Sequence, residues 1–184
     1  MKSKSRMAVH ASALLVPFLA EATSKSTVLT ALIAVTALYL VSEALRLKGG
    51  RLPFITEFTL RMSREDERTH FIARPVYLAA GVILSLLLFP TSIAYASITI
   101  VAVGDPVASY FGQRFGRTRI GRKTLEGFVA GSIVSFAGAL PWVHPNLALI
   151  GSAAGMLLEL LEIPDDNLAM SIGAGSAMVI VRIL

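Results

Sequence analysis

Cysteine is absent from the 184-residue sequence, and histidine occurs only three times. The lack of cysteine excludes disulfides and metal sites built from thiolates. There is also no HExxH segment, no His/Cys cluster and no Ser-His-Asp order, so zinc-enzyme and serine-hydrolase chemistry have no support. The chemistry that remains is that of carboxylates and basic side chains.

Charged residues are scarce as well, at 16% of the chain against 54% hydrophobic residues. Soluble domains are about 45–50% apolar. The charges collect in a few loops between long apolar runs, which is typical of a membrane protein with basic loops. The net charge of +5 therefore does not indicate nucleic-acid binding. At this length we expect one domain, residues 1–184.

The apolar runs are too long for strands and show no alternation, so they predict helices. A bilayer core of roughly 30 Å takes about 20 apolar residues as a helix. The predicted fold class is therefore all-α, a polytopic transmembrane bundle of about seven spans. The expected spans are Met7–Ala22, Thr27–Leu47, His70–Phe89, Thr91–Tyr110, Leu125–Val143, Asn146–Leu161 and Asn167–Leu184.

Three prolines, Pro17, Pro75 and Pro90, are expected to mark kinks or ends of these helices. The first run also has features of a secretory signal, with a basic end and small residues near Ala20. His10 within it and the polytopic remainder favour a retained first helix.

Lysine and arginine are distributed unevenly among the loops. Three lie at the N-terminus, seven between Arg46 and Arg74, and five between Arg114 and Lys123. Seven alternating spans place these 15 of the 17 basic residues on one side. The positive-inside rule then predicts an integral membrane protein whose N-terminus and basic loops are cytoplasmic.

Between the second and third spans, Phe54, Ile55, Phe58 and Met62 recur at helical spacing. This pattern predicts a short interfacial amphipathic helix. It is either a connector lying on the membrane surface or a gate or sensor for lipid headgroups.

The stretch Gly104–Gly131 frames a basic, glycine-rich loop between Asp105 and Glu126. Glycine-rich loops and helix N-termini hold phosphate, and Thr124 is placed to cap the next helix. The segment GRTRIGRKT is close to a P-loop, but Arg122 is inserted before Lys123 and no strand precedes it. A P-loop NTPase is therefore rejected.

Several acids lie in or at the ends of apolar runs, where a charge costs about 2.5–3.5 kcal/mol or more. A row of small residues, Gly151 and Gly155, continues to Glu159 and predicts that this acid faces inward. Carboxylates and an amide beside a basic loop suit Mg²⁺ bridged to phosphates. The alternative is that the acids neutralise nearby basic residues. The acids and amide concerned are Glu43, Asp105, Glu126, Glu159, Asp165, Asp166 and Asn167.

These residues together resemble the family of dolichol kinases, phytol kinases and CTP-dependent diacylglycerol kinases. The resemblance rests on GDPVASYFGQRFG, GRKTLEGFVAG, Glu159 in LLELLE and Asp165–Asn167, and on Ser42-Glu43 ahead of Arg46. Arg6 and His10 resemble the Arg-Lys-x-x-His opening of the family, although Met7 stands where lysine is usual.

The resemblance implies phosphoryl transfer from CTP to the hydroxyl of a membrane lipid alcohol, with Mg²⁺ as cofactor. It implies catalytic roles for Asp105, Glu126, Lys123 and Glu159, and metal ligation by Asp105, Glu126, Asp166 and Asn167. The residues expected to bind the nucleotide or its phosphates are Arg6, His10, Gly112, Arg114, Gly116, Arg119, Arg122, Lys123 and Thr124.

Polyprenols of the dolichol type, diacylglycerol and phytol-like alcohols all remain acceptors at this point, and CTP is favoured over ATP by the resemblance alone. Two other functions fit parts of the pattern: a cytidylyltransferase that makes a CDP-lipid, and a membrane transporter. Transporters commonly carry internal repeats and binding sites near the midplane, and neither is evident here. Rows of small residues on the helices allow a homodimer.

Overall fold

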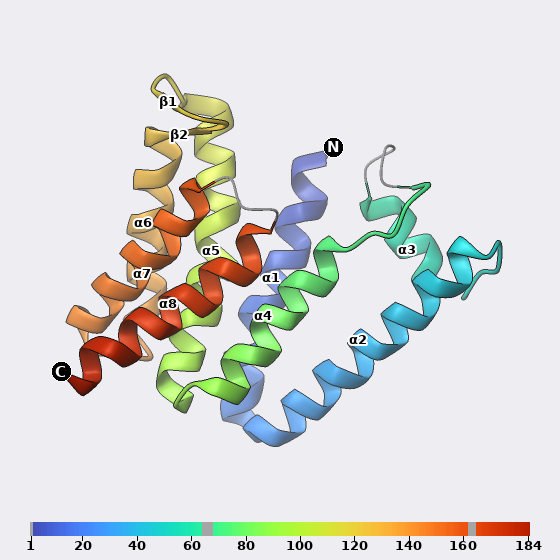
Figure 1. Ribbon diagram of the computed structural model, residues 1–184, viewed down its shortest axis with the longest axis horizontal. Helices are drawn as coiled ribbons and strands as arrows, with labels where there is room; N and C mark the ends of the chain where they lie inside the picture. Colours follow the sequence, from blue (N-terminus) through green and yellow to red (C-terminus); the bar gives the residue numbers. More distant parts are fainter. Residues whose placement is uncertain (1, 64–67, 162–164) are drawn as a thin grey trace.

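The computed structural model describes residues 2–63, 68–161 and 165–184, and among these the side chains of residues 2–8 and 62 are outside the description. Within these ranges the chain is a bundle of helices (Figure 1), which confirms the all-α prediction. The helices are α1 (Lys2–Ala22), α2 (Lys25–Leu47), α3 (Ile55–Met62), α4 (Arg74–Leu88), α5 (Thr91–Phe115), α6 (Leu125–Ala139), α7 (Pro145–Leu160) and α8 (Asp166–Ile183).

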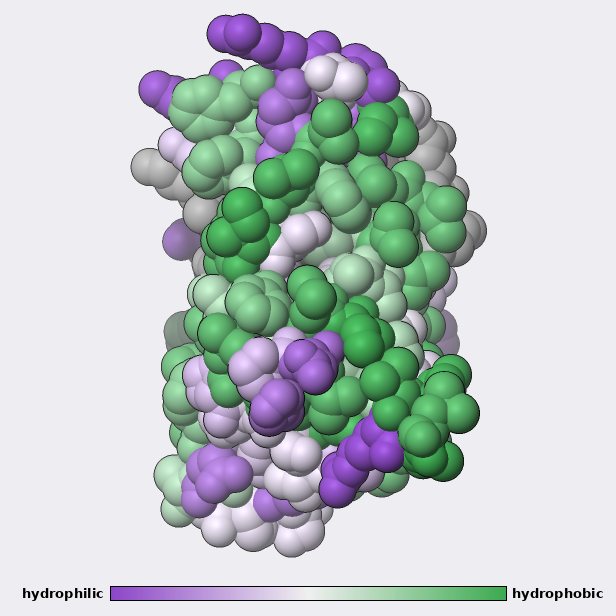
Figure 2. Space-filling view, turned by 90° about the vertical axis from the view of Figure 1, so that its left-hand side faces the viewer, coloured by the Kyte–Doolittle hydropathy of each residue, from purple (hydrophilic) through white to green (hydrophobic). Residues whose placement is uncertain are grey.

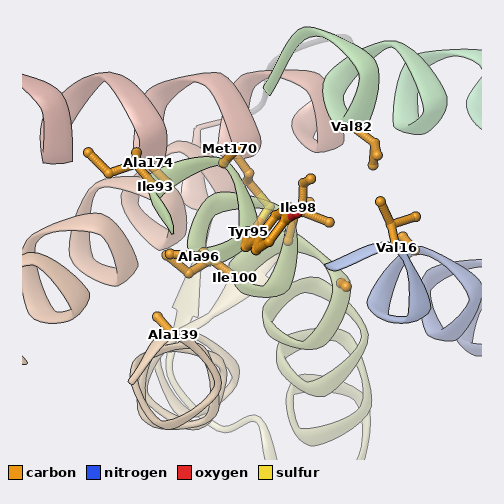
Figure 3. Packing of buried hydrophobic residues seen from close by; sticks show 14 of the residues in the cluster. Val16, Val82, Ile93, Tyr95, Ala96, Ile98, Ile100, Ala139, Met170 and Ala174 are labelled. Carbon is orange, nitrogen blue, oxygen red and sulfur yellow. The ribbon is translucent and has the colours of Figure 1, made fainter. Parts of the chain in front are cut away.

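Helix α5 is the centre of the bundle and packs against α1, α4, α6, α7 and α8. Its isoleucines 93, 98 and 100 are completely buried. Figure 3 shows them surrounded by side chains such as Val16 of α1, Val82 of α4 and Met170 of α8. Because α5 is enclosed on several sides, its residues are held in fixed positions relative to all these neighbours.

Small residues let α6 approach α5 closely, as the rows of small residues predict. A methyl group on Gly104 would lie 2.3 Å from Ser135 Oγ of α6. One on Gly131 would lie 2.9 Å from Ala108 Cβ and 3.0 Å from the Gly104 carbonyl oxygen. These contacts leave no room for a side chain at either glycine.

Helix α2 lies apart from the rest of the bundle over much of its length (Figure 1) and exposes large apolar side chains. In the described parts of the chain, α2 and α5 are the two helices long and apolar enough to cross a membrane. Helix α5 is mostly buried within the bundle, whereas α2 is mostly exposed. The exposed apolar residues of α2 include Ile33, Val35, Leu38, Leu40, Val41 and Leu45.

Each of the seven predicted spans coincides with a helix, with differences at the ends. Helix α5 continues to Phe115 rather than ending at Tyr110, α4 begins only at Arg74, and α6 ends at Ala139. Pro75 lies in the first turn of α4, where its missing N–H costs nothing. Pro17 was expected to mark a kink or an end, and α1 continues through it.

The glycine-rich loop contains a small antiparallel hairpin of β1 (Arg119–Ile120) and β2 (Lys123–Thr124). Arg119 pairs with Thr124, and Gly121 makes the turn at a φ of +58°, which glycine adopts readily. The exclusion of strands applies only to the apolar runs, and these four residues lie in the basic loop between two of them; two-residue strands are too short to show alternation.

The N-terminus, α3, the hairpin and the start of α8 lie at one end of the bundle, and the α1–α2 and α4–α5 turns lie at the other (Figure 1). The described backbone of the three basic segments therefore lies toward one end of the bundle, and the cytoplasmic location of that end stays a prediction. On the face shown in Figure 2, hydrophobic residues cover the middle, and hydrophilic residues lie both at the upper end, which carries the hairpin, and over the lower part.

Candidate functional site

Three carboxylates from three helices meet at the hairpin end of the bundle. They are Asp105 of α5, Glu159 near the end of α7 and Asp166 at the start of α8, and one oxygen from each lies within 4.8 Å of the other two. Asp105 and Glu159 are buried, and Asp166 is partly exposed. We call these three residues the acid cluster. The prediction that Glu159 faces inward is confirmed.

Lys123 reaches the acid cluster from the hairpin. Its Nζ donates to Glu159 Oε1 and, at 3.0 Å, to Asp166 Oδ2. Burial disfavours the ammonium, but the hydrogen bond to Glu159 and the charges of both acids outweigh it and raise the pKa of Lys123 above its usual value. The antiparallel pairing of Lys123 with Ile120 fixes the strand from which this side chain projects.

His10 of α1 contacts the remaining acid, with Nε2 3.2 Å from Asp105 Oδ2. Both residues are buried. The sequence predicts a phosphate contact for His10, and the structure places it beside Asp105. Arg6 lies one turn earlier on α1, and its side chain lies outside the described residues.

Asn167 follows Asp166 on α8, and its side chain is nine-tenths buried. Its Oδ1 has no hydrogen-bond partner in the described part of the chain. Asp165 caps this helix by accepting from the backbone N–H groups of Asn167 and Leu168, at 3.1 and 3.2 Å. Burial raises the pKa of Asp165 above its usual value, and the charge of Asp166 adds to this rise. This cap therefore fixes the position of the first residues of α8, Asp166 and Asn167.

Thr124 and two glycines hold the hairpin against α5. Thr124 Oγ1 accepts from the Gly127 N–H at 3.2 Å, which confirms the predicted N-cap of α6. A methyl group on Gly112 would lie 2.7 Å from Thr124 Oγ1, and one on Gly116 2.5 Å from Thr124 Cγ2. These residues were predicted to bind phosphate, and the contacts that the structure shows are packing contacts.

Three arginines of the basic stretch differ in position. Arg119 and Arg122 line the same cavity as Glu159 and Asp166 of the acid cluster. Arg114 lies over the Phe115 ring, with its guanidinium carbon 5.8 Å from the ring centre, and is not among the residues that line this cavity. Of the basic residues predicted to contact phosphate, Arg119, Arg122 and Lys123 therefore lie together at the cavity, and Arg114 does not.

Besides Asp165, which caps α8, two of the singled-out acids lie outside the acid cluster. The Glu126 carboxylate accepts from the Thr118 backbone N–H, at 3.0 and 3.3 Å, and so holds the loop before β1. Glu43 forms two bonds with Arg46, of 2.7 and 2.8 Å, and accepts from the Ile72 N–H at 3.0 Å. The structure thus gives both residues local partners away from the three acids.

One cavity of 1910 Å³ has a polar part, which Glu159 and Asp166 of the acid cluster line, and an apolar part, which we call the apolar arm. Asp105 is fully buried beside these two acids and does not line the cavity. The polar part of the cavity is lined by His10, Lys123, Glu159, Asp166 and Asn167, together with Arg119 and Arg122. Its apolar part is lined by Val9, Ala13 and Val16 of α1, Leu32 and Val35 of α2, and Leu78 and Val82 of α4. The cavity can accept a molecule with a charged head and a hydrocarbon tail.

The sequence analysis missed Ser109 and Gln113, which line the cavity on α5 and are joined by a 3.1 Å hydrogen bond. They follow Asp105 at intervals of four, so they lie on the same face of the helix. This four-residue spacing could have been recognised in the sequence as placing both residues on the face of Asp105.

The site offers side chains that suit two kinds of ligand, a divalent cation and phosphate groups. The acids and the Asn167 oxygen present the hard oxygen ligands that a divalent cation takes. The hairpin adds Lys123, Arg119 and Arg122, whose positive charges suit phosphate groups. Comparison with protein-family models, with curated proteins and with solved structures finds no match to the chain.

Proposed function

We propose that this chain is an integral membrane kinase that transfers a phosphoryl group from a nucleoside triphosphate to the hydroxyl of a lipid alcohol. The observation that carries the proposal is one continuous cavity that is lined by Glu159 and Asp166 of the acid cluster, by the basic hairpin, and by an apolar arm between α1, α2 and α4. A phosphate site and a hydrocarbon site in one cavity suit the transfer of phosphate to a lipid. The resemblance of the sequence to lipid-alcohol kinases favours CTP as donor.

The side chains of the acid cluster fit a magnesium ion. Three carboxylate oxygens lie within 4.8 Å of one another, and the buried Asn167 Oδ1 is an amide oxygen that needs a partner. We assign Asp105, Glu159, Asp166 and Asn167 as the residues that would hold it. Bound Mg²⁺ would supply neutralisation of the charge on the phosphate oxygens. Glu126, which the resemblance also implies as a ligand, is not in this set.

The side chains of the cavity carry the rest of the reaction. Lys123, Arg119 and Arg122 bind the triphosphate. The lipid hydroxyl oxygen attacks the terminal phosphorus, a new O–P bond forms, and the bond to the bridging oxygen breaks so that the nucleoside diphosphate leaves with its electron pair. The hydroxyl proton passes to Glu159, the buried acid of the cluster that lines the cavity.

The proposal includes a membrane topology. The exposed apolar surface of α2 and the other apolar helices would face lipid, with seven helices crossing the bilayer. The basic end of the bundle, with the N-terminus and the hairpin, would lie on the cytoplasmic side. The nucleotide then enters from water, and the lipid enters from the bilayer.

The test is incubation of the purified protein in lipid nanodiscs with labelled CTP or ATP and a panel of polyprenols, phytol-like alcohols and diacylglycerol. We expect a lipid monophosphate and a nucleoside diphosphate, and no product with Asp105→Asn. Release of pyrophosphate with a CDP-lipid would instead identify a cytidylyltransferase. Movement of a solute into liposomes without any phosphate transfer would identify a transporter.

A further inference from the structure

The short helix α3 buries two threonines and exposes Phe58, and Phe54 is exposed just before the helix. Thr56 and Thr59 are buried, and Thr56 Oγ1 bonds to Ser42 Oγ of α2 and to the Leu52 N–H, at 3.3 and 3.0 Å. Phe54 and Phe58 are 87% and 61% exposed, and the charged pair of Glu57 and Arg61 is exposed beside them. Two large aromatic rings therefore face outward from this segment, where burial in an apolar medium would be favourable.

The backbone at Phe54 adopts a strained conformation, and the Phe54 side chain projects outward from it. Phe54 has φ +66° and ψ −54°, and the Ile55 N–H donates to the Pro53 carbonyl oxygen at 2.8 Å, which closes a γ-turn. A residue other than glycine is strained in such a conformation. Because the ring is almost fully exposed, packing within the chain does not offset this strain. A favourable contact outside the chain would do so.

The surroundings of α3 indicate the chemistry of that contact. Arg51, Arg61 and Arg68 are exposed close to it in the chain, and they complement anionic lipid headgroups. Helix α2, on which α3 packs, continues the apolar surface through side chains such as Val35, which is 65% exposed. Aromatic rings beside arginines next to an apolar helix are the pattern of a membrane interface.

Helix α3 also borders the cavity. Phe54, Ile55 and Phe58 line it together with Leu32 and Val35 of α2, the residues of the apolar arm. Glu57 and Arg61 line the same part of the cavity, so apolar and charged side chains of this segment border the cavity that Glu159 and Asp166 line elsewhere.

We infer that Phe54 and Phe58 form a lip that inserts into the boundary between headgroups and acyl chains and opens the cavity sideways to the bilayer. The occupant of the outward face is the lipid bilayer, and the chains of the entering lipid pass along the same surface. The passage of a substrate rests on the proposed kinase function. The insertion of the lip does not, because it follows from the exposure and backbone of α3 alone.

The absence of native cysteine makes the test direct, since a single introduced cysteine takes one nitroxide label. We would label Phe54→Cys and Phe58→Cys in nanodiscs of mixed neutral and anionic lipid. Collision with oxygen, which concentrates in lipid, is then compared with collision with a water-soluble nickel chelate. Val35→Cys on α2 is the lipid-facing reference. Glu57→Cys is the matched control, because Glu57 is on α3, 65% exposed, and paired with Arg61.

We expect the labels at positions 54 and 58 to resemble that at 35, with oxygen favoured, and the label at 57 to favour the nickel chelate. Labels at 54 and 58 that behave like the one at 57 would overturn the inference. So would strong spin coupling between labels of two copies, which would make the surface a dimer contact. The measurement needs no turnover, so a protein that inserts the lip but transfers no phosphate would refute the kinase proposal alone.

Phe54→Gly provides a second measurement. Glycine adopts a positive φ without strain, so this variant should unfold at a temperature no lower than the wild-type protein in the same nanodiscs. The label at position 58 should then lie closer to water, because one of the two anchoring rings is lost. A large fall in the unfolding temperature would show that Phe54 is held by contacts within the chain, and would contradict the lip.

Discussion

The ammonium group of Lys123 lies between the carboxylates of Glu159 and Asp166 and donates to one oxygen of each. The three residues come from the hairpin, from α7 and from α8, so this contact joins segments that are distant in the sequence. Lys123 is 26% exposed, and the Glu159 side chain is almost fully buried. The lysine therefore supplies a countercharge to acids that repel one another, and it is also within reach of a bound phosphate.

Lys123→Met should lower phosphoryl transfer by about 10²–10³-fold, the usual loss when one electrostatic contact to the transition state is removed. The variant should also gain more thermal stability from added Mg²⁺ than the wild-type protein does, because its acid cluster lacks the lysine countercharge. Turnover and unfolding temperature against Mg²⁺ concentration measure the two effects. Lys25→Met is the matched control, since Lys25 donates to the Phe89 carbonyl oxygen instead. Equal Mg²⁺ effects in both variants would contradict the placement of the cation.

Asp105→Asn and Glu126→Gln should separate the two acids that frame the basic loop. Asp105 belongs to the acid cluster, so its amide variant should lose both the Mg²⁺-dependent rise in unfolding temperature and the activity. Glu126 accepts from the Thr118 backbone, and a glutamine oxygen can still do so. Glu126→Gln should therefore keep the Mg²⁺ effect. If Glu126→Gln loses this effect as completely as Asp105→Asn, Glu126 is a metal ligand, as the resemblance implies.

The sequence predicts the helices well because long apolar runs without alternation are compatible with helices and not with strands. It also predicts the inward position of Glu159 from the Gly151–Gly155 row. It could not distinguish Glu126 from Glu159, because both are acids at the ends of apolar runs. Which one faces the acid cluster depends on the hairpin, whose register sends Lys123 toward Glu159 and leaves Glu126 beside Thr118. Pairing of such short strands follows from packing on α5 and leaves no periodic signal. The partnership of His10 with Asp105 likewise depends on how α1 crosses α5.

Glu43→Ala should destabilise the fold by about 3–5 kcal/mol, since it leaves the charge of Arg46 buried without its partner. Both side chains are at most 9% exposed, and together they fix the backbone at Arg68, His70 and Ile72. Glu57→Ala is the control, because its pair with Arg61 is largely exposed and should contribute about 0–1 kcal/mol. Unfolding by titration with sodium dodecyl sulfate measures both. A similar cost for the two variants would show that the Glu43 pair does not hold the segment before α4.

The contribution of Lys123 to stability should persist to high pH. Because the pKa of Lys123 is raised in the folded protein, its ion pairs stabilise the fold fully below 10.5, the ordinary value for lysine. This contribution is lost only as the pH rises through the higher folded value. The difference in unfolding free energy between the wild-type protein and Lys123→Met, measured without Mg²⁺, should therefore be constant from neutral pH upward and shrink only above about 10.5. Taking the difference cancels the titrating groups that do not interact with Lys123, which behave alike in the two proteins. A difference that already disappears in the mildly alkaline range would mean that burial outweighs the two acids and that Lys123 gives up its proton early.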